Sequence, residues 1–379
     1  MKQIVKQTKN QTFVYLYALA IIMVIDDHCG TCIGINSKLF PYNSSYMPLF
    51  VFCSGYFFKQ RKPEDAIAQK IRRLLIPYII YDAVMTGLAC IVDSTFHTKW
   101  YRSVTVNSIV RMLAGHPTTD LNGAAWFAIM LFWVSVIYLF LYDLAKKLVR
   151  QDARRDCLLT GLFTMCAFAS LYICIYKPDY VSQPVRWGCK TAFFLQFYHL
   201  GHMFRTYFET ILQKQSKSLV CLSCIVINGI LIILFGDAIT FPATVGMKNF
   251  HYITLPLVTS ITGILFYYEV MSFLAENIGE RKAVSFISNN TFVIMQVHLL
   301  FVNIPNLYMY YAVTHGSAKF QDFPTDAVMY STWERYGPRS NLIAFFCGVF
   351  GSLLVAYAIE QSKSWIEKSI HLPIHLSKG

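Results

Sequence analysis

A short polar cluster closes the first apolar stretch of this 379-residue chain. The hydrophobic run 13–25 leads directly into Asp26, Asp27 and His28. Ionisable side chains in or at the edge of a bilayer are costly, so they are functional candidates by default. Because a histidine titrates near neutral pH and suits general-base catalysis, His28 predicts proton transfer to or from a hydroxyl. The alternative is that residues 26–30 simply emerge into water.

A second histidine lies in a late apolar segment. Thr291, Met295 and His298 share one face at helical spacing. If the N-terminus is inside, His28 and His298 both fall in the outer half of the membrane, where two helices can line one cavity. A lone buried histidine is more often a packing residue, and two at one level favour a site.

A basic run follows the second apolar segment, with Arg72 and Arg73 just before Pro77 and Tyr78. Arginine offers bidentate, permanently charged donors, which suit the phosphates of a cofactor. The same residues suit an inner-leaflet anchor, and the segment by itself favours the anchor.

The composition indicates which elements must position these residues. The chain is 55% hydrophobic and only 14% charged, with a mean hydropathy of +0.43. Soluble domains carry about 25% charged residues, so this pattern is typical of an all-α, polytopic membrane bundle. Since a span needs roughly 20 apolar residues, we predict about ten spans in one domain over 1–379. They are 13–28, 46–58, 74–93, 124–143, 158–176, 187–204, 219–236, 251–275, 284–304 and 342–360.

The distribution of Lys and Arg predicts the orientation. With both termini cytoplasmic, the inner segments hold about twice as many basic residues as the outer ones, as the positive-inside rule requires. The net charge of +12 therefore reflects topology and the lipid bilayer as partner, not nucleic acid. No small-x-small cleavage site follows the first run, which favours a retained helix over a signal peptide.

Two further features allow more than one interpretation. Cys29 and Cys32 form a C-x-x-C, for which a disulfide is favoured over a redox or metal role because no second ligand pair accompanies it. The predicted outer segment 305–341 is rich in Tyr and Trp, including Trp333. Such aromatics can stack on sugar rings, but an interfacial aromatic belt is the default interpretation.

Taken in order, these segments resemble the acyltransferase 3 family of bacterial integral membrane O-acyltransferases. The likeness rests on the first helix from Tyr15 to His28, the segment 47–58 with its Ser-Gly-Tyr-Phe core, the run 72–78 and the segment 288–298. Ala125-Trp126-Phe127 fits the family's Trp-Phe entry to its fourth helix.

The resemblance implies transfer of an acetyl group from cytoplasmic acetyl-CoA to a hydroxyl of a sugar or cell-envelope glycan, in the bacterial cytoplasmic membrane, with no metal. On this hypothesis His28 is the general base or transiently carries the acyl group. Asp26 or Asp27 polarises a catalytic imidazole, for which His298 is the candidate. Arg72 and Arg73 hold the CoA phosphates. Donors for the oxyanion stay open among His298, Gln296, Ser54 and a backbone N–H.

One position departs from the family pattern. The family usually has a basic residue separated by ten residues from the first-helix histidine, and Tyr17 stands there. Tyr17 then supplies a hydrogen bond to the donor, another cation substitutes, or the donor is handled differently. This departure leaves room for a non-catalytic family member. Separately, ten helices with polar intramembrane residues equally suit an exporter of envelope polysaccharide precursors.

Overall fold

The computed structural model describes residues 2–34, 37–101, 103–241, 247–248 and 250–370, and over these ranges the regular structure is helical. The helices are α1 (Lys2–His28), α2 (Tyr42–Tyr56), α3 (Pro63–Lys70), α4 (Ile76–Phe96), α5 (Val106–Leu113), α6 (Trp126–Leu148), α7 (Asp152–Tyr176), α8 (Gln183–Met203), α9 (Glu209–Leu212), α10 (Lys217–Phe235), α11 (Leu255–Ile278), α12 (Lys282–Asn289), α13 (Thr291–Val302), α14 (Ile304–Thr314), α15 (Thr325–Tyr330) and α16 (Pro338–Ile370). Short 3-10 turns lie at Asp120–Ala125 (η2), Pro178–Tyr180 (η3), Gly236–Ile239 (η5) and Ala318–Phe320 (η6), and π-helical turns at Ile71–Leu75 (η1) and Phe204–Phe208 (η4).

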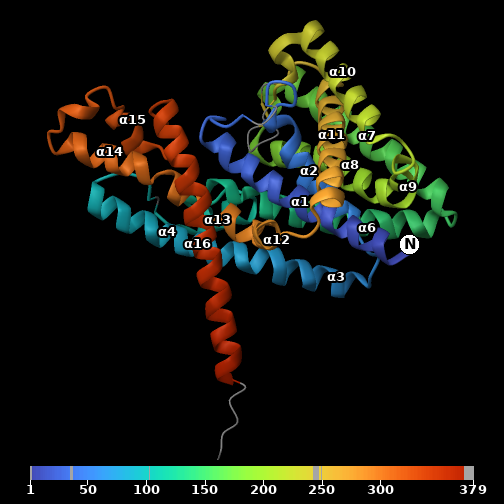
Figure 1. Cartoon of the computed structure of the whole chain (residues 1–379), viewed down its shortest axis with the longest axis horizontal. Coiled ribbons are helices and arrows are strands. Elements are labelled where there is room, and N and C mark those ends of the chain that lie inside the picture. The colour runs from blue at the N-terminus through green and yellow to red at the C-terminus, as the bar shows by residue number, and fades with distance from the viewer. Residues whose placement is uncertain (1, 35–36, 102, 242–246, 249, 371–379) are drawn as a thin grey trace, which may run out of the picture.

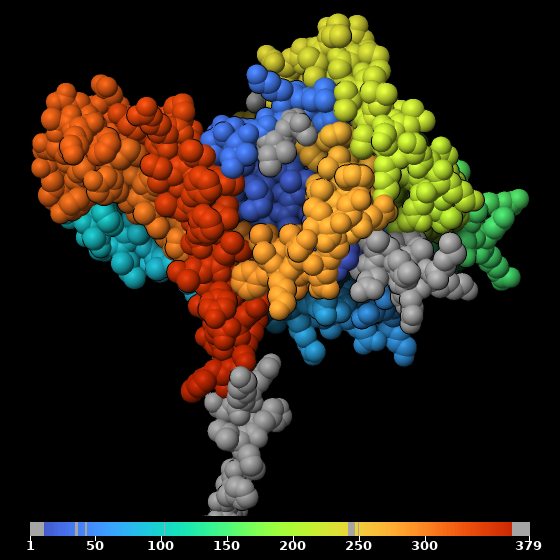
Figure 2. Space-filling model, viewed as in Figure 1, coloured from blue at the N-terminus to red at the C-terminus, as the bar shows by residue number. Residues whose placement is uncertain are grey.

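Helix α1 is the central element of the bundle. It packs against α2, α11, α12, α13 and α16, and in Figure 2 its blue surface lies between the red α16 and the gold α11. Figure 1 shows α14 and α15 beside α4, forming a lobe at one side of the molecule. Because α1 is surrounded, its polar C-terminal end is enclosed by elements from distant parts of the chain.

The segment with the Ser-Gly-Tyr-Phe core packs tightly on α8. A Cβ placed on Gly55 would lie only 1.8 Å from the carbonyl oxygen of Tyr198. Only a glycine permits this backbone-to-backbone approach between α2 and α8, in the way that small residues allow membrane helices to pack closely. The glycine of the motif therefore has a packing reason.

The outer surface of the bundle is suited to lipid. Seven helical segments of the described chain are long and apolar enough to cross a bilayer: Pro63–Phe96, Asp120–Leu148, Asp152–Tyr176, Lys217–Ile239, Leu255–Ile278, Thr291–Thr314 and Pro338–Trp365. Apolar side chains such as Ile233, which is 83% exposed, cover the outward faces. An all-α, polytopic membrane protein is therefore confirmed. The three remaining predicted spans lie in α1, α2 and α8, of which α2 has 15 residues.

The predicted span 284–304 differs in the structure. The helix is interrupted at Asn290, whose amide donates to Glu360 Oε1 on α16 at 2.8 Å, and α13 begins at Thr291. The apolar segment then continues through Asn303 into α14, with Pro305 in its first turn. The candidate span is therefore Thr291–Thr314, because a side-chain contact with α16 stabilises a break that apolar periodicity does not reveal.

Candidate active site

The end of α1 and the middle of α13 bring two histidines together. His28 Nδ1 lies 2.7 Å from His298 Nε2, and the two rings are nearly parallel, with an interplanar angle of 12°. The His298 side chain is fully buried, whereas His28 is partly exposed. Residues that are 270 positions apart in sequence thus form one directly bonded pair.

The hydrogen-bond partners fix which nitrogens carry protons. His298 Nδ1 lies 3.0 Å from the carbonyl oxygens of Ile294 and Met295, which can only accept, so Nδ1 is the donor. In a neutral ring, Nε2 of His298 is then an acceptor, and His28 must donate to it from Nδ1. Nε2 of neutral His28 consequently bears a free lone pair, since no described residue hydrogen-bonds to it. A free, oriented lone pair is what a general base requires.

A loop between α15 and α16 fixes the end of α1. Arg335 Nε donates to the carbonyl oxygen of His28 at 2.8 Å, and Nη1 donates to the Thr332 carbonyl at 3.0 Å. A cation at a helix C-terminus satisfies a free carbonyl and opposes the negative end of the helix dipole. Nη2 of Arg335 is buried and has no partner among the described residues. Sequence reasoning missed Arg335, because nothing in a loop 307 residues away points to His28.

The same loop places an indole beside the histidine pair. The Trp333 ring meets the His28 ring edge-on, with centroids 5.3 Å apart, and remains 43% exposed. A Cβ on Gly123 would lie 2.5 Å from Trp333 Cζ2, so the glycine makes room for the indole. The segment that leads to Gly123 is fixed by Asp82, a buried carboxylate on α4, which accepts a hydrogen bond from Thr118 Oγ1 at 2.7 Å. Trp333 thus lies against His28 while much of its indole stays exposed.

The two predicted carboxylates turn away from each other. Asp26 accepts from the backbone N–H groups of Ile33 and Gly34, each at 2.9 Å, and from the Cys32 thiol at 3.2 Å. It therefore anchors the loop after α1. Asp27 accepts from the Tyr46 hydroxyl on α2 at 2.9 Å. Asp26 thus contacts a loop, and Asp27 contacts α2. The catalytic roles of both carboxylates remain predictions.

The cysteines of the C-x-x-C are free thiols. Burial, together with the hydrogen bond to Asp26 and the charge of that carboxylate, raises the pKa of the Cys32 thiol to about 12. A thiol with this pKa is almost entirely protonated at neutral pH and is a poor nucleophile. Because both cysteines are free, the favoured disulfide is not present. Cys32 instead donates a hydrogen bond to Asp26.

A second hollow lies about 16 Å further along α1, three turns before His28. This cavity of about 490 Å³ is bordered by Tyr17 of α1, Arg73 of η1 and Tyr198 of α8. Four basic side chains also line it, namely Lys59, Arg61, Lys70 and Arg73. The structure thus places Tyr17 and Arg73 around one cavity. Arg72 and Arg73 are both exposed, but Arg72 does not border the cavity.

The backbone explains why adjacent arginines differ. Residues Ile71–Leu75 form a π-helical turn, in which the N–H of Ile76 bonds to the carbonyl of Ile71. The wider turn shifts the register between α3 and α4, and single π turns recur at functional sites. The π turn and the cavity form only in the folded chain. The sequence Arg72-Arg73 alone therefore could not indicate that Arg73 borders the cavity and Arg72 does not.

The candidate hydrogen-bond donors to an oxyanion differ in whether their N–H or O–H groups already have an acceptor. The Ser54 hydroxyl donates to the Phe50 carbonyl at 2.9 Å, so its proton is already used. Both amide atoms of Gln296 are buried without a described partner, as is Nη2 of Arg335. Of these groups, Arg335 is bonded directly to the residue that carries the free lone pair.

Comparison with known proteins decides the class of chemistry. A family model described as an acyltransferase domain matches residues 15–361, nearly the whole chain. The chain belongs to the acyltransferase 3 family. It is accordingly a membrane acyltransferase, and the match spans both the histidine pair and the basic cavity. No curated protein and no solved structure matches the chain.

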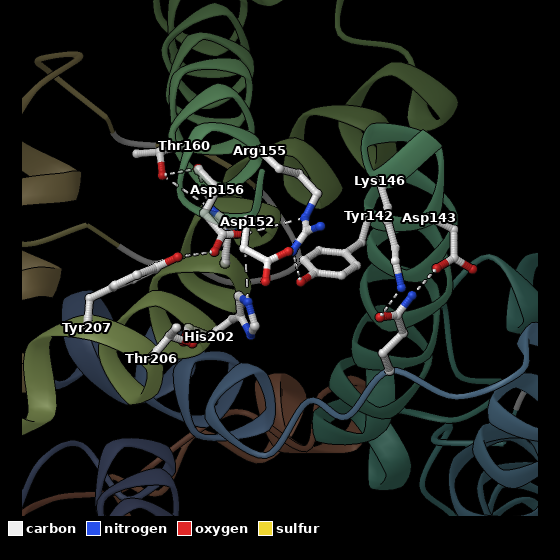
Figure 3. A network of polar contacts seen from close by, with 12 residues as sticks. Tyr142, Asp143, Lys146, Asp152, Arg155, Asp156, Thr160, His202, Thr206 and Tyr207 are labelled. Atoms are coloured by element: carbon white, nitrogen blue, oxygen red, sulfur yellow. Dashed lines mark hydrogen bonds and ion pairs between the residues drawn. The ribbon is translucent and has the colours of Figure 1, made fainter. Parts of the chain in front are cut away.

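Another buried polar cluster of this acyltransferase has a different character (Figure 3). Asp156 on α7 accepts from the Tyr207 hydroxyl at 2.8 Å and lies 3.8 Å from His202 Nε2. Its neighbour Arg155 pairs with Asp152 at 2.8 Å and bonds to the Tyr142 hydroxyl at 2.8 Å. The cluster ties α6, α7 and α8 to the π turn η4, so its evident role is to join helices.

Proposed function

We propose that this acyltransferase moves an acetyl group from acetyl-CoA to a hydroxyl of a cell-envelope glycan, with His28 as the general base. The observation that carries the proposal is the His28–His298 pair, whose hydrogen bonds leave Nε2 of His28 as a free acceptor. A hydroxyl is a weak nucleophile until it loses its proton, and a positioned base contributes roughly 10² to 10⁴-fold to such a step.

The reaction requires two proton movements at one atom. Nε2 of His28 takes the proton of the acceptor hydroxyl while the oxygen attacks the thioester carbonyl. The tetrahedral intermediate collapses with cleavage of the C–S bond, and the sulfur leaves with the proton from Nε2. The products are the acetyl ester and free CoA. His298 stabilises the transient imidazolium through the bond that it accepts from Nδ1.

The cavity beside Tyr17 supports a phosphate-bearing donor. Lys59, Arg61, Lys70 and Arg73 provide the positive charge that three phosphate groups require. They also supply cations where Tyr17 replaces the usual basic residue. The thioester of CoA lies at the end of a long flexible arm, which suits the separation of about 16 Å between Tyr17 and His28 along α1. In the predicted topology, this cavity faces the cytoplasm.

The indole beside His28 supports a sugar as acceptor. Trp333 is 43% exposed although it contacts the His28 ring, and a flat aromatic face binds the C–H face of a sugar. An interfacial-belt tryptophan has no reason to contact a catalytic imidazole. Nη2 of Arg335, buried and without a described partner, is the candidate donor to the oxyanion.

The test is transfer of labelled acetyl by purified protein in nanodiscs with radiolabelled acetyl-CoA and envelope glycan extract. Wild type should label the glycan, and His28→Ala should not. Trp333→Ala should lower transfer to glycan while acetyl-CoA binding is unchanged. Transfer by His28→Ala at the wild-type rate would refute the assignment, and glycan flux without acetyl transfer would favour the exporter.

A further inference from the structure

The most unusual charge outside the proposed reaction site is a lysine inside the bundle. Lys190 on α8 is 2% exposed. Its ammonium lies 4.5 Å from the Trp126 ring and 5.3 Å from the Trp187 ring. No described residue gives it a carboxylate or hydrogen-bond partner. Because buried charges in membrane proteins are normally paired, a buried lysine that contacts only indole rings favours the approach of an anion.

Other basic groups lie on the same helix as this lysine and on the segment packed against Trp187. Arg186 lies one turn earlier on α8, and its Nε is buried without a described partner. Trp187 packs over Gly115, which precedes His116. Burial and then the charges of Lys190, Arg111 and Arg186 lower the pKa of His116. We call Arg111, His116, Arg186 and Lys190 the α5–α8 basic cluster.

A polar hollow opens at this cluster. A cavity of about 180 Å³ is bordered by Arg111 and His116, together with Ser103, Asn107 and Thr118. One water needs only about 10–15 Å³ of such space, so a hydrated oxyanion fits. The hollow lies at the same end of the bundle as His28. Thr118, which borders the hollow, is followed in the chain by Gly123, which lies against Trp333, and Trp333 in turn contacts the His28 ring.

We propose that the α5–α8 basic cluster binds an oxyanion of the phosphate or carboxylate type. Arg111 and His116, which border the hollow, contact the anion. Lys190 and Arg186 do not border it and contribute through the electrostatic field of their positive charges. The tryptophan cage holds the ammonium in place when the site is empty, since a cation is attracted to an indole face. This site is separate from the basic cavity near Tyr17, and none of its residues takes part in the proposed transfer step.

Binding is measured by thermal unfolding of the purified full chain in phosphatidylcholine nanodiscs, with inorganic phosphate titrated against chloride at equal ionic strength. Phosphate should raise the wild-type Tm in a saturable manner. Lys190→Met and Arg111→Gln should weaken the apparent phosphate Kd by at least about tenfold. Arg111→Gln changes an exposed side chain, so it tests the site even if Lys190→Met alters the basal Tm.

The matched control is Lys177→Met, an exposed lysine just beyond α7 that should leave the phosphate response unchanged. A second arm replaces phosphatidylcholine by phosphatidylglycerol without added phosphate, and distinguishes a lipid headgroup from a free ion. A response in either arm that Lys190→Met and Arg111→Gln remove supports the site. Equal responses in all variants, or no response of the wild type in both arms, would overturn it.

Discussion

Two regions of the molecule hold histidines between packed helices, and they differ in which ring nitrogens are left without a partner among the described residues. His199 on α8 uses both ring nitrogens: Nδ1 lies 3.0 Å from the Tyr138 hydroxyl, and Nε2 lies 3.0 Å from Thr160 Oγ1 and 3.1 Å from the Asp156 carbonyl. His28 uses Nδ1 on His298 and keeps Nε2 free among the described residues. A fully bonded histidine joins helices, whereas one with an open nitrogen is available for chemistry.

His28→Ala should give the largest effect on activity. Removal of the base should lower kcat by about 10³-fold, within the range of general-base effects. The Tm in nanodiscs should fall less than for His199→Ala, because the His28 ring makes one hydrogen bond and the His199 ring makes three. The measurement is labelled acetyl transfer per folded protein. A loss of activity that merely parallels a loss of folded protein would make His28 a structural residue like His199.

His199→Ala is the matched counterpart in the other cluster. It leaves the Tyr138 hydroxyl and the polar groups of α7 without their partner, which should lower the free energy of unfolding by about 3 kcal/mol. The Tm should fall clearly, and kcat per folded molecule should be unchanged. If His199→Ala abolished turnover without a change in Tm, the contrast between the two clusters would be wrong.

His298→Gln tests whether the partner imidazole positions the base. The amide cannot stabilise the His28 imidazolium in the same way, so kcat should fall by roughly 10²-fold while the KM for acetyl-CoA is unchanged. A pH profile of kcat should change shape relative to wild type. A structural role would lower the Tm and leave that profile alone, which would separate the two explanations.

Arg73→Ala should have a smaller and purely binding effect. Loss of one charge-assisted contact should raise the KM for acetyl-CoA by about tenfold with kcat retained. Arg72→Ala should raise it less, because Arg72 does not border the cavity. Equal effects of the two substitutions would mean that the π turn does not distinguish the neighbouring arginines.

The smallest effect is expected at Cys32. With a pKa of about 12, the thiol should react slowly with maleimide at pH 8 because almost none of it is thiolate. Asp26→Asn removes the negative charge that opposes ionisation, so the pKa should fall and labelling should accelerate. Exposed Cys157 serves as the internal reference. Unchanged labelling of Cys32 would contradict the assignment of Asp26 as the loop anchor.

Sequence patterns predicted much of this architecture because hydropathy depends on local composition. Long apolar runs predict helices in any context, and α4, α6, α7, α10 and α11 follow them. The break at Asn290 and the helical nature of Ile304–Thr314 were not predictable, since both depend on contacts with α16 and with the loop at Arg335.

The candidate site divides in the same way. The residue types at positions 28 and 298, the basic run near Arg73 and the family membership are determined by the sequence itself. Only the tertiary structure decides that the two imidazoles bond, that Arg335 and Trp333 close over them, and that Asp26 serves a loop. The physical reason is that protonation and orientation depend on partners brought together by helix packing, and neither spacing nor composition specifies those partners.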